Sequence, residues 1–166
     1  VGILSNRRIS RVLGQVVNGS SLEQGLILIE QCSSSNDPIL PNIDADHLAM
    51  AQFSSGTTNA PKPVGLTHRQ ILANVDAITS FIGEQEAGCS WLPLYHDMGL
   101  IGNVLQPIYL GISCVLMSPM AFIQKPVRWL QAISRYKGTT SGGPNFAYDL
   151  CVRKITPAQQ ATLDLS

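Results

Sequence analysis

Charge is scarce in this sequence. Only 13% of its 166 residues are Asp, Glu, Lys or Arg, and the 11 basic residues balance the 11 acidic ones. Without a run of lysine and arginine, the chain has no positive field with which to gather nucleic acid or an anionic membrane surface. We therefore expect no nucleic-acid partner.

Cysteine is also sparse, and the four cysteines are scattered. They form no C-x-x-C pair and have no histidine at metal-ligand spacing, which disfavours a zinc protein and predicts no metal site within the chain. A chain of this size can bury a core without disulfides. Reduced thiols in a cytoplasmic protein are therefore the expectation for Cys32, Cys89, Cys114 and Cys151.

Long apolar segments and some enzyme signatures are missing as well. No stretch is long enough to predict a membrane span, and no basic and apolar leader opens the chain. The G-x-S-x-G elbow is absent, which disfavours a serine hydrolase. The start at Val1 and the stop at Ser166 indicate cuts through a longer protein.

Strand and helix patterns alternate along the sequence, which is 45% hydrophobic. Capping boxes at Thr67–Gln70 and Thr156–Gln159 predict two helix starts, the second helix ending near Asp164. The fold class is therefore α/β, a mainly parallel layered sheet with helices on both faces. Apolar runs predict strands at 25–30, 48–53, 64–66, 89–92 and 112–117, and helical spacing predicts helices at 9–17, 67–83, 100–109 and 126–138.

Three polar or glycine-containing turns follow predicted strands. They are Ser54–Pro63, Pro93–Gly99 and Gly142–Asn145. Ligands of parallel sheets sit outside the carboxyl ends of the strands, so these turns are expected to border one crevice.

The first of these turns has the composition of a phosphate cradle. Four hydroxyl residues surround Gly56, and Lys62 closes the loop. Hydroxyls and glycine-freed N–H groups can wrap phosphate oxygens, while lysine supplies a mobile positive charge. No G-K-[ST] triplet follows the glycine, so the loop is not a Walker A motif. An ordinary Ser/Thr-rich surface loop is the simpler alternative.

Four segments together resemble one branch of the adenylate-forming superfamily, the fatty acyl-AMP ligases. FSSGTTNAPKPVGLTH (53–68) is similar to the phosphate-binding signature of the whole superfamily. The other three resemble the branch itself: SWLPLYHDMGLIG (90–102), SPMAFIQKPVRWL (118–130) and SGGPNFAYDL (141–150). In register, the resemblance covers residues 46–166.

The resemblance implies an enzyme that activates a fatty acid with ATP to an acyl-adenylate. The acyl group then passes to the pantetheine thiol of an acyl carrier protein, alone or within a downstream synthase domain. Residues 1–166 would be a fragment of the N-terminal AMP-binding domain. The family's adenine-binding turn, Mg²⁺ ligand and C-terminal domain lie beyond Ser166, so this chain alone is expected to be inactive in adenylation, with apolar surface exposed at its edges.

The resemblance also implies a role for individual residues. His96, in the Y-H-D turn, would border the reacting carboxylate and the α-phosphate. The remaining roles fall into three groups: triphosphate binding by Ser55, Gly56, Thr57, Thr58 and Lys62; close approach to the nucleotide by Gly142 and Gly143; and contact with the acyl chain by Met98, Gly99, Phe122, Asn145 and Phe146.

For several of these residues, a purely structural role is the alternative to the role that the resemblance implies. His96 could simply cap its turn, and Asp97 is expected to cap the helix that follows. Core packing explains the apolar residues nearly as well. Two positions depart from the family, which has glycine where Asn59 and Pro63 stand; Pro63 fixes φ and removes an N–H beside Lys62.

Other functions remain open. An acyl-CoA synthetase is the nearest alternative, although Arg153–Leu163 stands where the ligases carry an insertion, which favours a carrier protein over free coenzyme A. An amino-acid adenylation domain is disfavoured because the S-P-M-A-F and N-F-A-Y turns offer no aspartate to an amino group. A non-catalytic binding module that keeps the fold is the alternative from another class.

Overall fold

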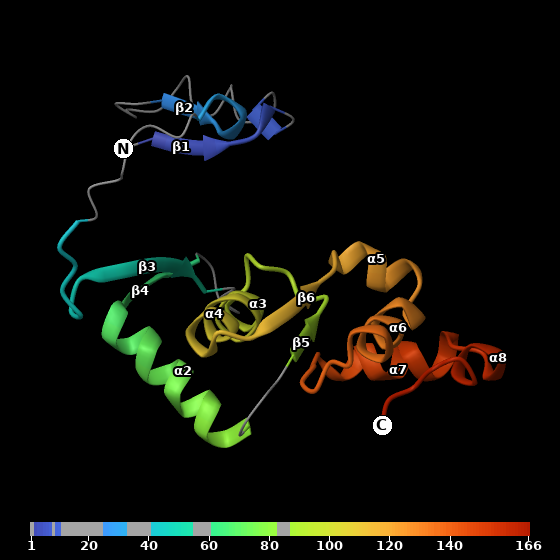
Figure 1. Ribbon diagram of the computed structural model, residues 1–166. Helices are drawn as coiled ribbons and strands as arrows, with labels where there is room; N and C mark the ends of the chain where they lie inside the picture. The colour runs from blue at the N-terminus through green and yellow to red at the C-terminus, as the bar shows by residue number, and fades with distance from the viewer. Residues whose placement is uncertain (1, 8, 11–24, 33–40, 55–60, 83–86) are drawn as a thin grey trace. The chain divides into compact units, whose positions relative to one another are not determined.

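The computed structural model describes residues 2–7, 9–10, 25–32, 41–54, 61–82 and 87–166 (Figure 1). The chain divides into two compact units, Val1–Asn42 and Ile43–Ser166. The helix predicted at 9–17 lies almost wholly outside the described residues.

The first unit contains a parallel strand pair, β1 (Gly2–Ser5) and β2 (Gly25–Leu28), in the register Gly2 to Gly25. A short 3₁₀ turn, η1 (Ile29–Gln31), ends the second strand. The Arg7 backbone N–H donates to both carboxylate oxygens of Glu30, at 3.0 and 3.1 Å. This contact lowers the pKa of Glu30.

The second unit opens with an antiparallel pair, β3 (Leu48–Phe53) and β4 (Pro63–Thr67). The antiparallel direction follows from the connection, because joining parallel strands takes a crossover of a dozen or more residues. Phe53 pairs with Pro63, so the strands close at the two ends of the predicted phosphate loop.

Helix α2 (His68–Ile82) begins with the predicted capping box. The Thr67 N–H donates to Gln70 Oε1 at 3.0 Å, and the Gln70 N–H donates to Thr67 Oγ1 at 3.3 Å. Among the apolar residues of this helix, Val75 is buried, while Ile82 is 44% exposed.

A parallel pair, β5 (Ala87–Ser90) and β6 (Ser113–Leu116), lies at the centre of the second unit (Figure 1). On the other side of β5, Gly88 forms a parallel bridge with Thr140, so three chain segments run in one direction. Between β5 and β6, the turn at 91–96 leads into a continuous helical segment: α3 (Asp97–Leu100), the π-helical turn η2 (Ile101–Leu105) and α4 (Gln106–Leu110). Gly111 ends it with φ +68°, as a left-handed helix cap requires.

Helices α5 (Pro119–Gln124), α6 (Val127–Tyr136), α7 (Asn145–Lys154) and α8 (Pro157–Gln160) complete the chain. The core here is one cluster of buried side chains: Cys89, Trp91, Leu92, Phe122, Trp129 and Ala147. The Thr156–Gln159 capping box is present at the start of α8, which ends at Gln160 rather than near Asp164.

Two local expectations differ from the structure. The strand predicted at 112–117 is a continuous apolar run, the pattern of a strand buried on both faces, yet Leu116 is 46% exposed. Among the described strands, β6 has β5 as its one partner. Helix α6 was expected to stop at Gly138, but Lys137 adopts the left-handed cap, with φ 52°. Gly138 is closely packed instead, because a Cβ there would lie 3.3 Å from the Cβ of Cys89.

Candidate active site

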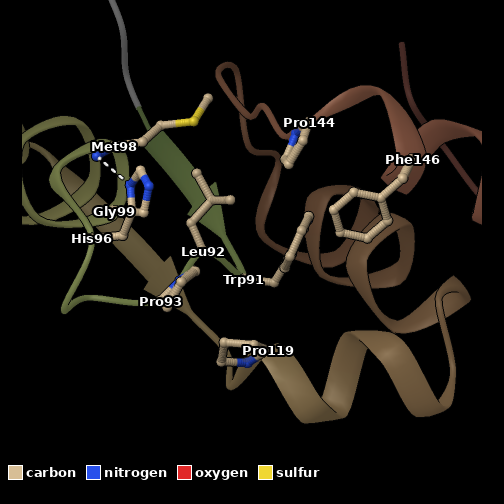
Figure 2. A pocket seen from close by; sticks show the side chains of 9 residues that line it. All are labelled: Trp91, Leu92, Pro93, His96, Met98, Gly99, Pro119, Pro144 and Phe146. Carbon is tan, nitrogen blue, oxygen red and sulfur yellow. Dashed lines mark hydrogen bonds between the residues drawn. The ribbon is translucent and has the colours of Figure 1, made fainter. Parts of the chain in front are cut away.

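An apolar cavity of about 240 Å³ lies where three parallel segments end (Figure 2). Trp91, Leu92 and Pro93 come directly after β5, Pro119 comes after β6, and Pro144 comes after the Thr140 bridge. The cavity therefore occupies the position at which open α/β sheets bind ligands. We call it the Trp91 cavity; its other lining residues are His96, Met98, Gly99 and Phe146.

Aromatic rings build one wall of this cavity. Trp91 stacks on Phe122 with ring centroids 4.1 Å apart, and Phe146 and Trp129 meet it edge-on at 5.9 and 6.1 Å. Phe146 lines the cavity and is half exposed. Phe122 is fully buried behind Trp91 and does not line the cavity. It therefore packs against the wall residue Trp91 and is not placed to contact an acyl chain. Asn145 is the exposed first residue of α7 and is also not a lining residue.

The glycines at this site serve different purposes. A Cβ at Gly99 would lie 2.1 Å from the Pro93 carbonyl oxygen, and one at Gly143 would lie 3.0 Å from the Trp91 ring. These two positions therefore need glycine for close packing. A Cβ at Gly142 would meet nothing within 4 Å, so its backbone faces open space.

A second cavity, of about 470 Å³, lies beside the end of β3. We call it the Ser54 cavity. Its walls come from both the hairpin and the Y-H-D turn, and the Gln52 amide nitrogen donates to the Tyr95 carbonyl at 3.4 Å to tie the two together. The lining residues are Gln52, Phe53, Ser54, Val64, Leu66, Tyr95, His96, Asp97 and Ile101.

His96 lines both cavities, and local hydrogen bonds fix its ring. Its Nδ1 lies 3.3 Å from the Met98 backbone nitrogen (Figure 2) and 2.6 Å from Asp97 Oδ1. Asp97 Oδ1 also accepts from the Met98 N–H, at 2.6 Å. The expected cap of α3 is therefore shared by His96 and Asp97. With Nδ1 engaged on the protein, Nε2 is the nitrogen left to contact a ligand.

The phosphate loop is described at its two ends. The Ser54 N–H donates to the Lys62 carbonyl at 2.9 Å, and the Lys62 N–H donates to Ser54 Oγ at 3.4 Å. These bonds hold the exposed Lys62 beside Ser54, in the hairpin that borders the Ser54 cavity. Pro63 takes the first position of β4, where a missing backbone N–H is tolerated. Ser55, Gly56, Thr57 and Thr58 lie outside the described residues.

Sequence reasoning missed several wall residues. Trp91, Leu92 and Pro119 line the Trp91 cavity and Gln52 lines the Ser54 cavity, with no role predicted for any of them. Pro93, Tyr95 and Pro144 also line these cavities; they belong to turns predicted to border a crevice but were given no role of their own. One signal was available for the residues of the Trp91 cavity, since Trp91 and Leu92 end one predicted strand and Pro119 comes two residues after another. Gln52 and Tyr95 meet only through tertiary structure.

Charged and metal-binding groups are few at the site. Among the described residues, no three or more His, Cys, Asp and Glu side chains gather closely enough to hold a metal ion.

No helix in the described part of the chain is both long and apolar enough to cross a bilayer.

Comparison with known proteins identifies the family. The family model for AMP-binding enzymes matches residues 5–166. This chain belongs to the AMP-binding enzyme family. This match, together with the relatives and solved structures described next, confirms the resemblance drawn from the four motifs and the α/β fold class.

Relatives within the AMP-binding family include carrier-protein ligases. The chain is 50% identical over 130 residues to the medium-chain fatty acid–acyl carrier protein ligase TtuA of Teredinibacter turnerae, covering 77% of this chain and 20% of that protein. The ligase of the same description from Moorena producens, JamA, is 47% identical over 128 residues, covering 76% and 22%. The chain thus spans about a fifth of the length of these curated relatives.

Solved structures show the same fold. A fatty acyl-adenylate ligase from Legionella pneumophila, in complex with acyl adenylate and pyrophosphate, superimposes with a TM-score of 0.84 at 38% identity. The match covers 100% of this chain and 29% of that one.

Proposed function

We propose that the complete protein is a fatty acyl-AMP ligase, which activates a fatty acid with ATP and passes the acyl group to an acyl carrier protein or a downstream synthase domain. Residues 1–166 would be a fragment of its N-terminal AMP-binding domain. The observation that carries the proposal is the position of His96 between an apolar and a more polar cavity. The similarity of this chain to carrier-protein ligases supports it.

The two cavities divide the substrates by their chemistry. In this proposal the Trp91 cavity takes the acyl chain, which contacts Met98, Gly99 and Phe146. The Ser54 cavity takes the ATP phosphates, held from the hairpin by Ser55, Gly56, Thr57, Thr58 and Lys62. Gly142, whose backbone has open space in front of it, supports close approach of the nucleotide.

His96 would then stand where the carboxylate and the α-phosphate meet. Both groups are anionic, so their reaction needs negative charge to be neutralised and the two reactants to be aligned. An imidazole fixed through Nδ1 can donate from Nε2 to an oxygen on either group. Lys62 would steady the pyrophosphate that leaves. Mg²⁺, the family's usual companion of ATP, would be held by residues outside this chain.

Pyrophosphate exchange on the complete protein, with fatty acids of several lengths, tests this proposal. Exchange that depends on a fatty acid, followed by acyl transfer to a carrier protein and not to coenzyme A, is expected. Transfer to coenzyme A would make the protein an acyl-CoA synthetase. Absence of exchange with every acid would leave a binding module that keeps the fold.

Replacing His96 tests the assignment of this residue. His96→Ala should lower the kcat of exchange by about 100-fold to 1,000-fold, the usual effect of removing one donor to developing charge. His47→Ala is the control, because His47 is also exposed and caps a turn, accepting from the Asp44 N–H at 3.2 Å. Equal activity of the two variants would remove His96 from the reaction.

We further propose that the protein works in the cytoplasm. The supporting observation is that Cys32, Cys89, Cys114 and Cys151 are all free thiols, as a reducing compartment would keep them.

A further inference from the structure

Gln106 is a buried polar residue whose side-chain nitrogen has no partner among the residues that the structure describes. It is 3% exposed, and its Nε2 makes no hydrogen bond with the described part of the protein. An amide buried in this way costs free energy, because it has lost water and gained nothing in exchange. An unpartnered buried amide of this kind indicates that a bound ligand supplies the missing hydrogen-bond acceptor.

The helix containing Gln106 is wound so that this residue faces inward. The turn Ile101–Leu105 is π-helical, and the Gln106 N–H donates to the Ile101 carbonyl, five residues back. As a result polar Gln106 is buried while apolar Ile108 is 73% exposed, the reverse of what their side chains prefer. Turns of this kind interrupt α-helices mostly at functional sites.

Gln106 lines a third cavity, of about 200 Å³, which we call the Gln106 cavity. Its polar walls come from Asn103, Thr140 and Ser141 beside Gln106, and among the described residues none that lines it is charged. Two of its walls, Leu92 and Met98, also line the Trp91 cavity. Met98 is half exposed and has a flexible thioether side chain, so the partition between the cavities can yield to a ligand.

We propose that Gln106 selects acyl chains that carry a neutral oxygen, because its amide donates a hydrogen bond to a hydroxyl or carbonyl group that enters the Gln106 cavity. A carboxylate is disfavoured because the described walls of this cavity contain no cation. This inference rests on the proposed function for the acyl chain in the Trp91 cavity. Gln106 is thus a specificity residue and takes no part in the chemical step.

Binding measurements on the complete protein test the selectivity. By calorimetry, medium-chain hydroxy and keto acids should bind at least about tenfold more tightly than unsubstituted acids of the same length, for one position of the oxygen along the chain. Gln106→Met keeps the volume but removes the donor, so the preference should disappear while the unsubstituted acids bind as before. Gln131→Met, an exposed glutamine on α6, is the matched control and should keep the preference.

Thermal unfolding without ligand gives an independent readout. If the amide is unpartnered, Gln106→Met should leave Tm unchanged or raise it, because an apolar side chain pays no penalty for burial. A Tm well below that of Gln131→Met would mean that a fixed water or another part of the protein already satisfies the amide, and would overturn the inference. Equal binding of oxygenated and unsubstituted acids by the unaltered protein would overturn it as well.

The pyrophosphate-exchange assay separates this inference from the proposed function. Exchange with fatty acids but no preference for an oxygen would reject the role of Gln106 alone. A preference in binding without any exchange would reject the ligase and keep the role of Gln106. No binding of any acid would reject both.

Discussion

At the scale of single residues, Gly99 has no room for a side chain. A Cβ there would lie 2.1 Å from the Pro93 carbonyl oxygen, whereas one at Gly102 would meet nothing within 4 Å. The resemblance implies that Gly99 contacts the acyl chain, yet the atom nearest to a side chain at this position belongs to the preceding Pro93 turn. The carbonyl of Pro93 and the first turn of α3 can pack together only because position 99 is glycine.

Gly99→Ala should therefore destabilise the protein by about 3 kcal/mol or more, at the upper end of what overpacking costs. Gly102→Ala is the matched variant and should be neutral or stabilising by up to about 1 kcal/mol, since alanine favours helix. Urea unfolding of both variants measures the difference. Similar stabilities would show that the Pro93 turn can move away.

Burial also raises the pKa values of three cysteine thiols. It raises the pKa of Cys89 from 9.0 to about 11, with Cys114 adding to the effect, and raises the pKa values of Cys114 and Cys151 as well. Because the folded protein holds the Cys89 proton more tightly than the unfolded chain, this contribution to stability is complete below pH 9 and is lost as the pH rises toward 11.

Alkylation of the native protein at pH 8 should accordingly label exposed Cys32 first and Cys89 last, since roughly one Cys89 thiol in a thousand would be ionised. Mass spectrometry of timed samples gives the order. Labelling of Cys89 as fast as Cys32 would contradict both its burial and its raised pKa.

At the scale of secondary-structure elements, helix α2 depends on its N-terminal cap. Thr67 and Gln70 exchange two hydrogen bonds that satisfy backbone N–H groups no helical carbonyl can reach. This box was readable from the sequence because its residue types and spacing are local. The π-helical turn before Gln106 was not, because apolar periodicity assumes a regular 3.6-residue turn.

Thr67→Ala should cost about 1 kcal/mol of stability through the loss of this cap. Ser80→Ala, late in the same helix, is the control, because its hydroxyl only bonds back to the Asp76 carbonyl at 2.9 Å; its effect should stay within about 0.5 kcal/mol. Denaturant midpoints of the two variants give the comparison. A cost no greater for Thr67→Ala would mean that packing alone holds the start of α2.

At the scale of the whole molecule, the α/β class and most strands follow from the alternation of apolar runs, but the site does not. The Trp91 cavity needs the ends of β5, β6 and the Thr140 segment to meet, and the sequence pointed to only some of its walls. The position of His96 between two cavities likewise depends on contacts between distant segments, such as Gln52 with Tyr95. Local patterns carry no information on such contacts.

Large apolar side chains also remain exposed across the molecule. Phe81 is 92% exposed, Val152 80% and Ile108 73%. The chain of 166 residues, studied by itself, should therefore bind the dye ANS and elute from a sizing column at a larger apparent mass as its concentration rises. A monomer at every concentration with no dye signal would show that these side chains find cover within the chain.

The aromatic wall of the Trp91 cavity has an optical consequence. The sequence contains two tryptophans, and their surroundings differ. The Trp129 indole N–H is already bonded to Ser141 Oγ at 2.7 Å, while the Trp91 N–H has no partner among the described residues and its ring borders the cavity. Filling the cavity should change the emission of Trp91 and leave that of Trp129 nearly constant. The protein thus carries its own fluorescent reporter of whether an acyl chain has entered.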